Sequence, residues 1–481
     1  MNRKMVFYTT GHILILEAIL FMLPLLCSVI YSETSSVIAF AISAGIALGV
    51  GLIMSALSYT KNKLIFAKEG FAIVALAWLA VSAVGALPFV IGKFIPSYVD
   101  AFFETVSGFT TTGATILSGT QIEAMSKGML FWRSFTHWIG GMGVLVFLMA
   151  ILPTDSGRSI HIMRAEVPGP IVGKIVPKIR ETAKILYLIY IGLTVIMVGF
   201  LLAGKMPLYD SLVHAFGTAG TGGFGIKADS VASYSPYLQW VITAFMLIFG
   251  INFNLYFLIL IGKFTSAIKS RELWCFGGIV AVSIGAIAIN ISSIGYSISE
   301  TIRHSAFQVA SIISTSGFAT VDMNAWPGFS KTVLLILMFI GSCAGSTAGG
   351  LKISRVMLLF KTVKADLRKM LRPRSVNVVK LEGKTVDDAT IHSTSVYLIT
   401  YFIIFLALIL IVSIDGFDME TTLSSVTSCL NNVGPAFGKA SASFSVFSDF
   451  STLILSFAML IGRLEIFPIL LALSPATWRK K

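Results

Sequence analysis

Apolar residues are gathered in blocks long enough to cross a membrane. A helix needs about 20 consecutive, mostly apolar residues to span the hydrocarbon core of a bilayer. Ten segments of this kind are present, at 11–31, 37–58, 71–92, 129–152, 185–204, 236–262, 273–292, 331–359, 393–413 and 449–473. The pattern predicts an all-α polytopic membrane protein with ten transmembrane helices.

Four shorter segments alternate with these spans from residue 71 onward. They are too short and too polar to cross, and they lie at 98–110, 207–219, 299–314 and 417–430. A segment of this type fits into a membrane only where protein or a water-filled cavity surrounds it. We therefore interpret the four segments as re-entrant pore helices, each entering from the outer side between two spans.

Each short segment is followed by a turn that contains glycine. The aligned glycines are Gly113, Gly223, Gly317 and Gly434, and a small residue stands six positions before each one, at Ser107, Gly217, Ser311 and Ser428. Self-similarity at a spacing of about 110 residues indicates one unit copied four times. This predicts an N-terminal two-helix domain at 1–60 and four pore units at 61–153, 154–263, 264–360 and 361–481.

The four glycine turns have the composition of a cation filter. Backbone carbonyls can replace the water shell of a cation and still release the ion, and glycine permits the backbone angles that turn successive carbonyls to one side. A hydroxyl or amide side chain precedes each glycine, at Thr111, Thr221, Thr315 and Asn432. Ordinary turns at the membrane interface would explain one such motif, but not four in matching positions. We expect one pseudo-four-fold pore.

Composition and charge agree with a membrane protein. Of 481 residues, 56% are hydrophobic and 12% are charged, whereas soluble proteins carry about 25% charged residues. This excludes a soluble enzyme and a disordered scaffold. Lys and Arg are concentrated in the segments expected on the cytoplasmic side, so both termini are predicted to lie in the cytoplasm. The net charge of +13 therefore indicates topology and not a nucleic-acid partner.

The segments expected outside carry more acidic than basic residues. An acidic mouth concentrates cations, which suits a cation pathway. The topology rule alone also explains this distribution, because it places the basic residues inside.

Small residues interrupt the span 331–359. Positions 341–350 are all small, which makes a weak helix. One interpretation is close packing of Gly341, Gly345 and Gly349 against another helix. The other is a broken helix whose loop crosses the pore below the filter.

Arg463 is a charge deep in the last span. Such a residue normally faces a cavity or a partner. Pairing with Glu465 is disfavoured, because residues two positions apart on a helix do not share a face. A cation in the wall of a pore repels a permeating cation, so Arg463 is a candidate gate residue.

The polar residues do not suggest catalysis. The chain has no catalytic constellation at membrane depth, its four cysteines have no disulfide or metal spacing, and its six histidines form no ligand motif. We expect neither enzyme activity nor a covalently bound cofactor. A symporter for another substrate would usually show inverted repeats, whereas these four units all run in the same direction.

The glycine turns and one further motif resemble a known family. The sequences TTTGAT (110–115), TGGFG (221–225), TSGFAT (315–320), NNVGPAF (431–437) and IGRLEIFP (461–468) are similar to the Trk/Ktr/HKT potassium transporters. The additional helix pair at 11–58 is typical of the TrkH-type membrane subunit. The resemblance implies potassium uptake across the bacterial cytoplasmic membrane, with K+ as the transported ion.

The resemblance also implies roles for individual residues. It places the K+ filter at Thr111, Thr112, Gly113, Thr221, Gly222, Gly223, Thr315, Ser316, Gly317, Asn432, Val433 and Gly434. The family has an intramembrane loop in its third unit, which implies a gate formed by Gly345, Ser346, Thr347, Ala348, Gly349 and Arg463. The fourth turn departs from the others, because Val433 and Pro435 flank its glycine.

Partners are implied by the resemblance alone. It suggests a homodimer that binds a TrkA-like cytosolic regulatory subunit. Nothing in this chain resembles a nucleotide site, so NAD or ATP/ADP is expected only on that subunit. The basic segments 153–184 and 352–392 are the expected docking surface, although contact with anionic lipid explains them equally well. Passive conduction and a proton- or sodium-coupled K+/Na+ symporter both remain open.

Overall fold

A computed structural model describes residues 1–60, 66–143, 179–373 and 378–479. Its strands form one antiparallel hairpin of β1 (Lys380–Leu381) and β2 (Lys384–Thr385). The α-helices in these ranges are α1 (Arg3–Leu20), α2 (Met22–Ile30), α3 (Thr34–Leu57), α4 (Ala67–Gly85), α5 (Leu87–Ile91), α6 (Tyr98–Phe109), α7 (Gly119–Ala124), α8 (Lys127–Gly141), α11 (Ile179–Ala203), α12 (Leu208–Ala219), α13 (Pro236–Phe249), α14 (Phe253–Leu260), α15 (Phe264–Ile268), α16 (Arg271–Ile291), α17 (Ile298–Ile313), α18 (Gly328–Ile340), α19 (Ile353–Leu371), α20 (Asp388–Val412), α21 (Met419–Asn431), α22 (Asp449–Arg463), α23 (Phe467–Leu473) and α24 (Pro475–Trp478). Short 3₁₀ helices follow the spans or their loops at η1 (Ser292–Ile294), η2 (Met323–Ala325), η3 (Ser413–Asp415), η4 (Gly438–Ala440) and η5 (Phe444–Val446).

Among the described residues, six helical segments are long and apolar enough to cross a membrane. They are Arg3–Ile30, Thr34–Leu57, Lys68–Ile91, Ala183–Ala203, Arg271–Ile294 and Asp388–Asp415. Two bent helix pairs, α13 with α14 and α22 with α23, raise the number to eight if each pair is one span. A multi-pass membrane protein is thus confirmed, whereas ten crossings remain a prediction.

Two of the predicted spans are bent and not straight. In the predicted span 449–473, α22 and α23 meet at 119°. The chain turns there because Glu465 and Ile466 adopt positive φ angles of 54° and 67°, and Pro468 in the first turn of α23 has no N–H to continue the helical ladder. In the predicted span 236–262, α13 and α14 meet at 89°, and the Asn252 side chain caps the start of α14.

Two further predicted spans are not continuous helices in the described residues. In 331–359, α18 ends at Ile340 and α19 begins at Ile353, with a non-helical loop between them. This is the broken helix that the run of small residues allows. The predicted span 129–152 begins as α8, and its residues 144–152 lie outside the described ranges, as does most of the basic segment 153–184.

The four short helices lie where the sequence predicts pore helices. They are α6, α12, α17 and α21, and their residues are largely buried although many are polar. Hydroxyl or carboxylate side chains cap three of them: Ser97, Ser297 and Asp418 each accept a hydrogen bond from a backbone N–H in the first turn. Such caps satisfy N–H groups that have no partner within the helix.

Polarity is distributed in the reverse of a soluble protein. Long helices expose apolar side chains, for example Ile403, Leu406 and Leu410 on α20. The interior contains buried Ser and Thr side chains from the short helices and the glycine turns. An apolar exterior around a polar interior is the arrangement expected of a pore-forming membrane protein.

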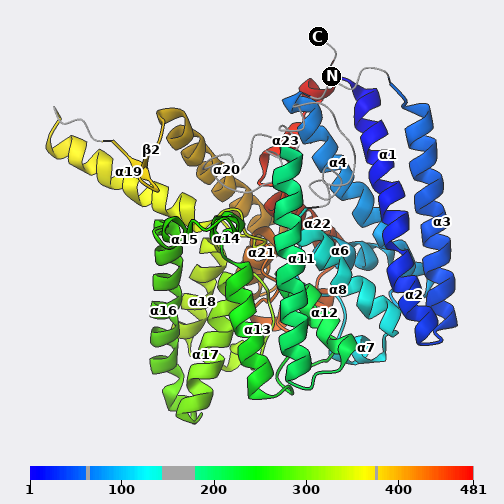
Figure 1. Cartoon of the computed structure of the whole chain (residues 1–481), viewed down its shortest axis with the longest axis horizontal. Coiled ribbons are helices and arrows are strands. Elements are labelled where there is room, and N and C mark those ends of the chain that lie inside the picture. Colours follow the sequence, from blue (N-terminus) through cyan, green and yellow to red (C-terminus); the bar gives the residue numbers. More distant parts are fainter. Residues whose placement is uncertain (61–65, 144–178, 374–377, 480–481) are drawn as a thin grey trace.

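The arrangement of the helices is shown in Figure 1. α1 and α3 form one flank, α16 lies on the opposite flank, and α21 and α22 lie between them. Both termini, α19 and the β-hairpin lie toward the upper end in this view, with the termini to the right and α19 and the hairpin at the far left. At that end the Arg3 guanidinium donates to the Trp478 carbonyl at 2.6 Å, which ties the two ends of the chain together.

Candidate functional site

The four glycine turns share one backbone conformation. The residue two positions before each glycine has a left-handed φ, at Thr111 (56°), Thr221 (56°), Thr315 (55°) and Asn432 (54°). Each filter glycine also has a positive φ, between 76° and 107°. In every turn the residue before the glycine donates its N–H to the carbonyl six positions before the glycine, at 2.9 Å (Thr112), 2.8 Å (Gly222), 2.8 Å (Ser316) and 2.9 Å (Val433).

The four turns contact one another in cyclic order. A β-carbon added to Gly113 would lie 1.8 Å from the carbonyl oxygen of Gly222, and one added to Gly223 would lie 1.9 Å from that of Ser316. A β-carbon added to Gly317 would lie 2.6 Å from the Val433 carbonyl oxygen, and one added to Gly434 would lie 2.6 Å from the Thr112 carbonyl oxygen. Each glycine therefore faces the carbonyl that precedes the next glycine, and the fourth turn closes on the first.

This geometry explains why glycine stands at these four positions. Real β-carbons essentially never approach another atom to within 3.0 Å, and the atoms met here are backbone atoms, which cannot swing aside. The positive φ adds strain for any residue with a side chain. The four glycines from which a filter was predicted thus reflect both a backbone angle and a close approach of two turns.

Hydrogen bonds between polar side chains stabilise three of the turns. Hydroxyls pair within the first turn (Thr110 with Thr112, 2.8 Å) and within the third (Ser314 with Ser316, 2.8 Å). Asn432 joins the fourth turn to the first, because its amide donates to the Thr112 hydroxyl at 2.9 Å. Buried polar groups that are hydrogen-bonded in this way hold the backbone in one arrangement.

The loop between α18 and α19, residues 341–352, lies against the filter. The N–H of Gly349 donates to the Thr315 hydroxyl at 2.8 Å, and a β-carbon added to Gly349 would lie 2.2 Å from the Asn431 oxygen. The loop thus touches the third and fourth turns. Two backbone bonds, from Leu351 to Phe339 and from Lys352 to Ile340, close its base.

The opposite side of the loop is held by neighbouring helices. The Ala344 N–H donates to the Glu272 carboxylate at 2.7 Å, and the Phe253 N–H donates to the Gly345 carbonyl at 3.0 Å. The loop therefore rests on the starts of α16 and α14. Its conformation depends on a few identifiable contacts.

Arg463, at the end of α22, connects the loop, the filter and α8. Its guanidinium donates to the Thr347 carbonyl (2.9 Å), to the Thr111 hydroxyl (3.1 Å) and to the carbonyls of Gly140 (2.5 Å) and Gly141 (3.0 Å). The structure thus brings the predicted gate arginine to both the predicted loop and the predicted filter.

Three charged residues near the loop were not singled out by the sequence. Arg355 pairs with Glu465 at 2.6 Å, so Glu465 is the partner of Arg355 and not of Arg463. The Lys352 ammonium is buried and donates to the Ala348 carbonyl within the loop. Glu272 directly precedes a predicted span. Its contact with the loop, through the Ala344 N–H, had no other signal in the sequence.

A buried ion pair lies next to the first and second glycine turns. Arg133 on α8 pairs with Glu104 on α6. The Glu104 carboxylate also accepts from the Ile116 N–H at 3.0 Å, and Arg133 donates to the Gly225 carbonyl at 3.1 Å. The pair links the segments that follow the first and second filter glycines.

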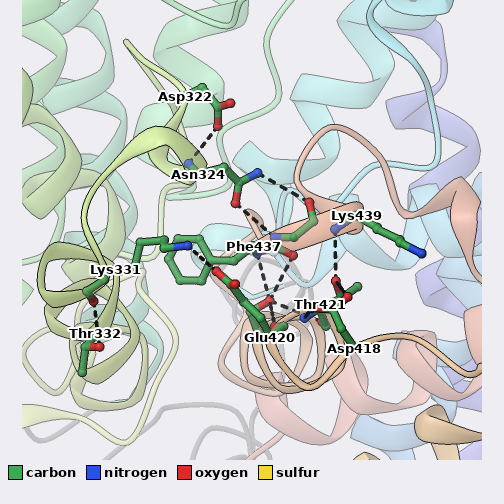
Figure 2. A network of polar contacts seen from close by, with 12 residues as sticks. Asp322, Asn324, Lys331, Thr332, Asp418, Glu420, Thr421, Phe437 and Lys439 are labelled. Carbon is green, nitrogen blue, oxygen red and sulfur yellow. Dashed lines mark hydrogen bonds and ion pairs between the residues drawn. The ribbon is translucent and has the colours of Figure 1, made fainter. Parts of the chain in front are cut away.

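A polar network links the segments that follow the third and fourth filter glycines (Figure 2). The Gly438 N–H donates to the Asn324 side chain at 3.0 Å, and the Lys439 N–H donates to the Thr421 hydroxyl at 3.0 Å. The Thr421 hydroxyl in turn donates to Asp418, and this bond together with the Thr421 N–H lowers the pKa of that carboxyl. Lys331 and Glu420 form an ion pair at 2.6 Å in the same network.

Comparisons with known proteins identify the family of the chain. A family model described as TrkH, cation transport protein, matches residues 37–276 and 287–480. The chain belongs to the TrkH family. It is 36% identical over 477 residues to the Trk system potassium uptake protein TrkH of Salmonella typhimurium, with 98% of each chain covered. It is 33% identical over 488 residues to TrkH of Halomonas elongata, with both chains fully covered.

A solved structure of a TrkH protein has the same fold. The crystal structure of the potassium transporter TrkH from Vibrio parahaemolyticus matches with a TM-score of 0.89 at 30% identity, and all of both chains is covered. The family resemblance inferred from the glycine turns is therefore confirmed. Because TrkH proteins are cation transport proteins, the prediction that the chain is not an enzyme is also confirmed.

Proposed function

We propose that this TrkH-family protein takes up K+ across the bacterial cytoplasmic membrane through the ring of four glycine turns. The cyclic contact of the four turns carries the proposal, because it brings four equivalent carbonyls around one axis. Such carbonyls can replace the water shell of K+. The ion-binding residues are Thr111, Thr112, Gly113, Thr221, Gly222, Gly223, Thr315, Ser316, Gly317, Asn432, Val433 and Gly434. The potassium uptake function of the named relatives supports the choice of ion.

The gate in this proposal consists of residues 345–349 and Arg463. The loop lies against the third and fourth filter turns, so it narrows the path of an ion that leaves the filter. The Arg463 guanidinium fixes the loop through Thr347 and adds a positive charge that repels K+. Opening requires the Arg463–Thr347 contact to break.

Regulation is assigned to the end that contains both termini, which we place in the cytoplasm. At that end α19 exposes a row of basic residues, among them Lys364, Arg368 and Lys369. This row suits docking of a TrkA-like subunit that carries the nucleotide, on a homodimer of this chain. Because α19 is the direct continuation of residues 341–352, a force on α19 would reach the gate through the backbone.

Proton-coupled transport is the second candidate, and a buried acid favours it. The carboxylate of Glu17 on α1 is buried, and neither of its oxygens has a hydrogen-bond partner among the described residues. It lies beside Gly85, where an added β-carbon would be 3.1 Å from Oε1 and 2.8 Å from Thr105 on the first pore helix. An unpaired carboxyl in such a site is stable only when protonated, so Glu17 could carry a proton.

One experiment tests both candidates. Purified protein in liposomes is assayed for Rb+ uptake, with and without a pH gradient, and compared with Gly113→Ser. We expect uptake down the Rb+ gradient alone, and less discrimination against Na+ in the variant. Absence of Rb+ flux through the folded protein would contradict the proposal, and flux that depends on the pH gradient would favour proton coupling.

A further inference from the structure

The second filter turn has no side chain at two positions where each of the other three turns carries one. Three and one positions before the filter glycine, the first turn carries Thr110 and Thr112, and the third carries Ser314 and Ser316. Each pair is joined by a hydroxyl–hydroxyl bond of 2.8 Å. The fourth turn has Asn431 and Val433 in these positions, whereas the second turn has Gly220 and Gly222.

The space that a side chain at Gly222 would occupy is filled by His137 from α8. A β-carbon added to Gly222 would lie 1.4 Å from Nδ1, 2.1 Å from Cε1 and 2.3 Å from Cγ of the imidazole. At Gly220, an added β-carbon would lie 2.2 Å from the His137 carbonyl oxygen. Neither glycine has a positive φ. Glycine is therefore required at these two positions because His137 leaves no room for a β-carbon, and not because of the backbone conformation.

The imidazole is enclosed by its neighbours in this position. His137 is fully buried, and its ring lies 4.2 Å from that of Phe224, the residue after the filter glycine. Both ring nitrogens are without a hydrogen-bond partner among the described residues. One turn earlier on α8, Arg133 donates to the Gly225 carbonyl at 3.1 Å. Helix α8 thus supports the second turn along its length.

We propose that His137 is the positioning residue of the second filter turn, and that its ring replaces the side chain which that turn lacks. The inference rests on the function proposed above and adds a specificity role for a residue outside the filter. Without the ring, the side chain of Thr221, whose hydroxyl donates to the Gly220 carbonyl at 2.6 Å, would be the only one left in a turn whose Gly220, Gly222 and Gly223 have large backbone freedom. The Gly222 carbonyl also faces Gly113 in the ring. A shift of this carbonyl would therefore disturb the first turn as well as the second.

The test moves a side chain from α8 to the second filter turn. His137→Ala removes the three ring atoms nearest to the position of a Gly222 β-carbon. Gly222→Ser adds the side chain that the third turn has at this place, but in the presence of the imidazole it clashes. The double variant H137A/G222S returns a side chain to the space. His12→Ala is the control, because His12 lies on α1, outside the four pore units, and its half-buried ring contacts the Tyr8 carbonyl at 2.9 Å.

The readout is the ratio of Rb+ to Na+ flux in liposomes, with the thermal midpoint of each purified protein as a measure of folding. We expect each single variant at His137 or Gly222 to lower the ratio by about tenfold or more, which corresponds to about 1.4 kcal/mol of discrimination. The double variant should recover most of the wild-type ratio, and His12→Ala should keep it.

Two results would overturn the inference. One is a wild-type ratio of Rb+ to Na+ flux in folded His137→Ala. The other is a double variant that is no more selective than either single variant. Each would mean that His137 only fills space. If a single variant does not fold, the double variant still decides, because recovered folding without recovered selectivity contradicts a specificity role. If the wild-type protein conducts no Rb+, it is the proposed function that fails, and this outcome is seen before any variant is compared.

Discussion

Replacement of Arg463 by glutamine should raise the basal flux of K+. Of the hydrogen bonds that the guanidinium makes to other described residues, one reaches the 341–352 loop, at the Thr347 carbonyl. A hydrogen bond to a charged group contributes about 1.5–3 kcal/mol. Its loss would shift the loop toward an open arrangement by about tenfold to about a hundredfold. Removal of the charge would add to this effect, because it lowers the barrier to a cation.

The assay is Rb+ flux into liposomes with no other subunit present, and two further variants make it specific. Arg463→Lys keeps the charge but cannot reach all four acceptors, so it should give an intermediate flux. Arg479→Gln removes an exposed arginine near the C-terminus and should change nothing. Unchanged or lower flux in well-folded Arg463→Gln would refute the gating role of this residue.

Three other changes test separate contacts. Glu272→Gln weakens the acceptor for the Ala344 N–H, so basal Rb+ flux should rise while selectivity stays at the wild-type ratio; a fall in flux would contradict this. Gly349→Ala places a β-carbon 2.2 Å from a carbonyl at the end of α21, so the loop must move and the flux measured in the same assay should rise. Arg133→Gln leaves the buried Glu104 carboxylate without its ion pair, which should cost about 3–5 kcal/mol of stability; an unchanged thermal midpoint would show that the pair is not needed for folding.

The positions of the four glycine turns could be predicted because the signals of such a turn are local. A positive φ and a close approach both require glycine at Gly113, Gly223, Gly317 and Gly434, so four similar turns could be recognised by composition and position. The short helices before these turns were also predictable, because each segment is too short and too polar to cross a membrane and lies between two apolar spans. The break at residues 341–350 also has a local signal, because a run of small residues with several glycines has a low helix propensity.

Contacts between distant segments were not predictable. The pairing of Arg355 with Glu465 and the bond from Ala344 to Glu272 join residues that only the fold brings together. The approach of the His137 ring to Gly222 was not predictable either, because it depends on the side chain that is missing at Gly222. The bends within 236–262 and 449–473 were missed because hydropathy measures length and polarity, and not direction.

The central claim, that four glycine turns form one closed filter, is tested most directly by the ratio of Rb+ to Na+ flux in four matched variants. Gly113→Ser, Gly223→Ser, Gly317→Ser and Gly434→Ser each place a side chain against the next turn, whereas Gly285→Ser on α16 meets no atom within 4 Å. All four filter variants should lose selectivity by about tenfold or more, and Gly285→Ser should keep the wild-type ratio. Wild-type selectivity in any folded member of the four would contradict the closed ring.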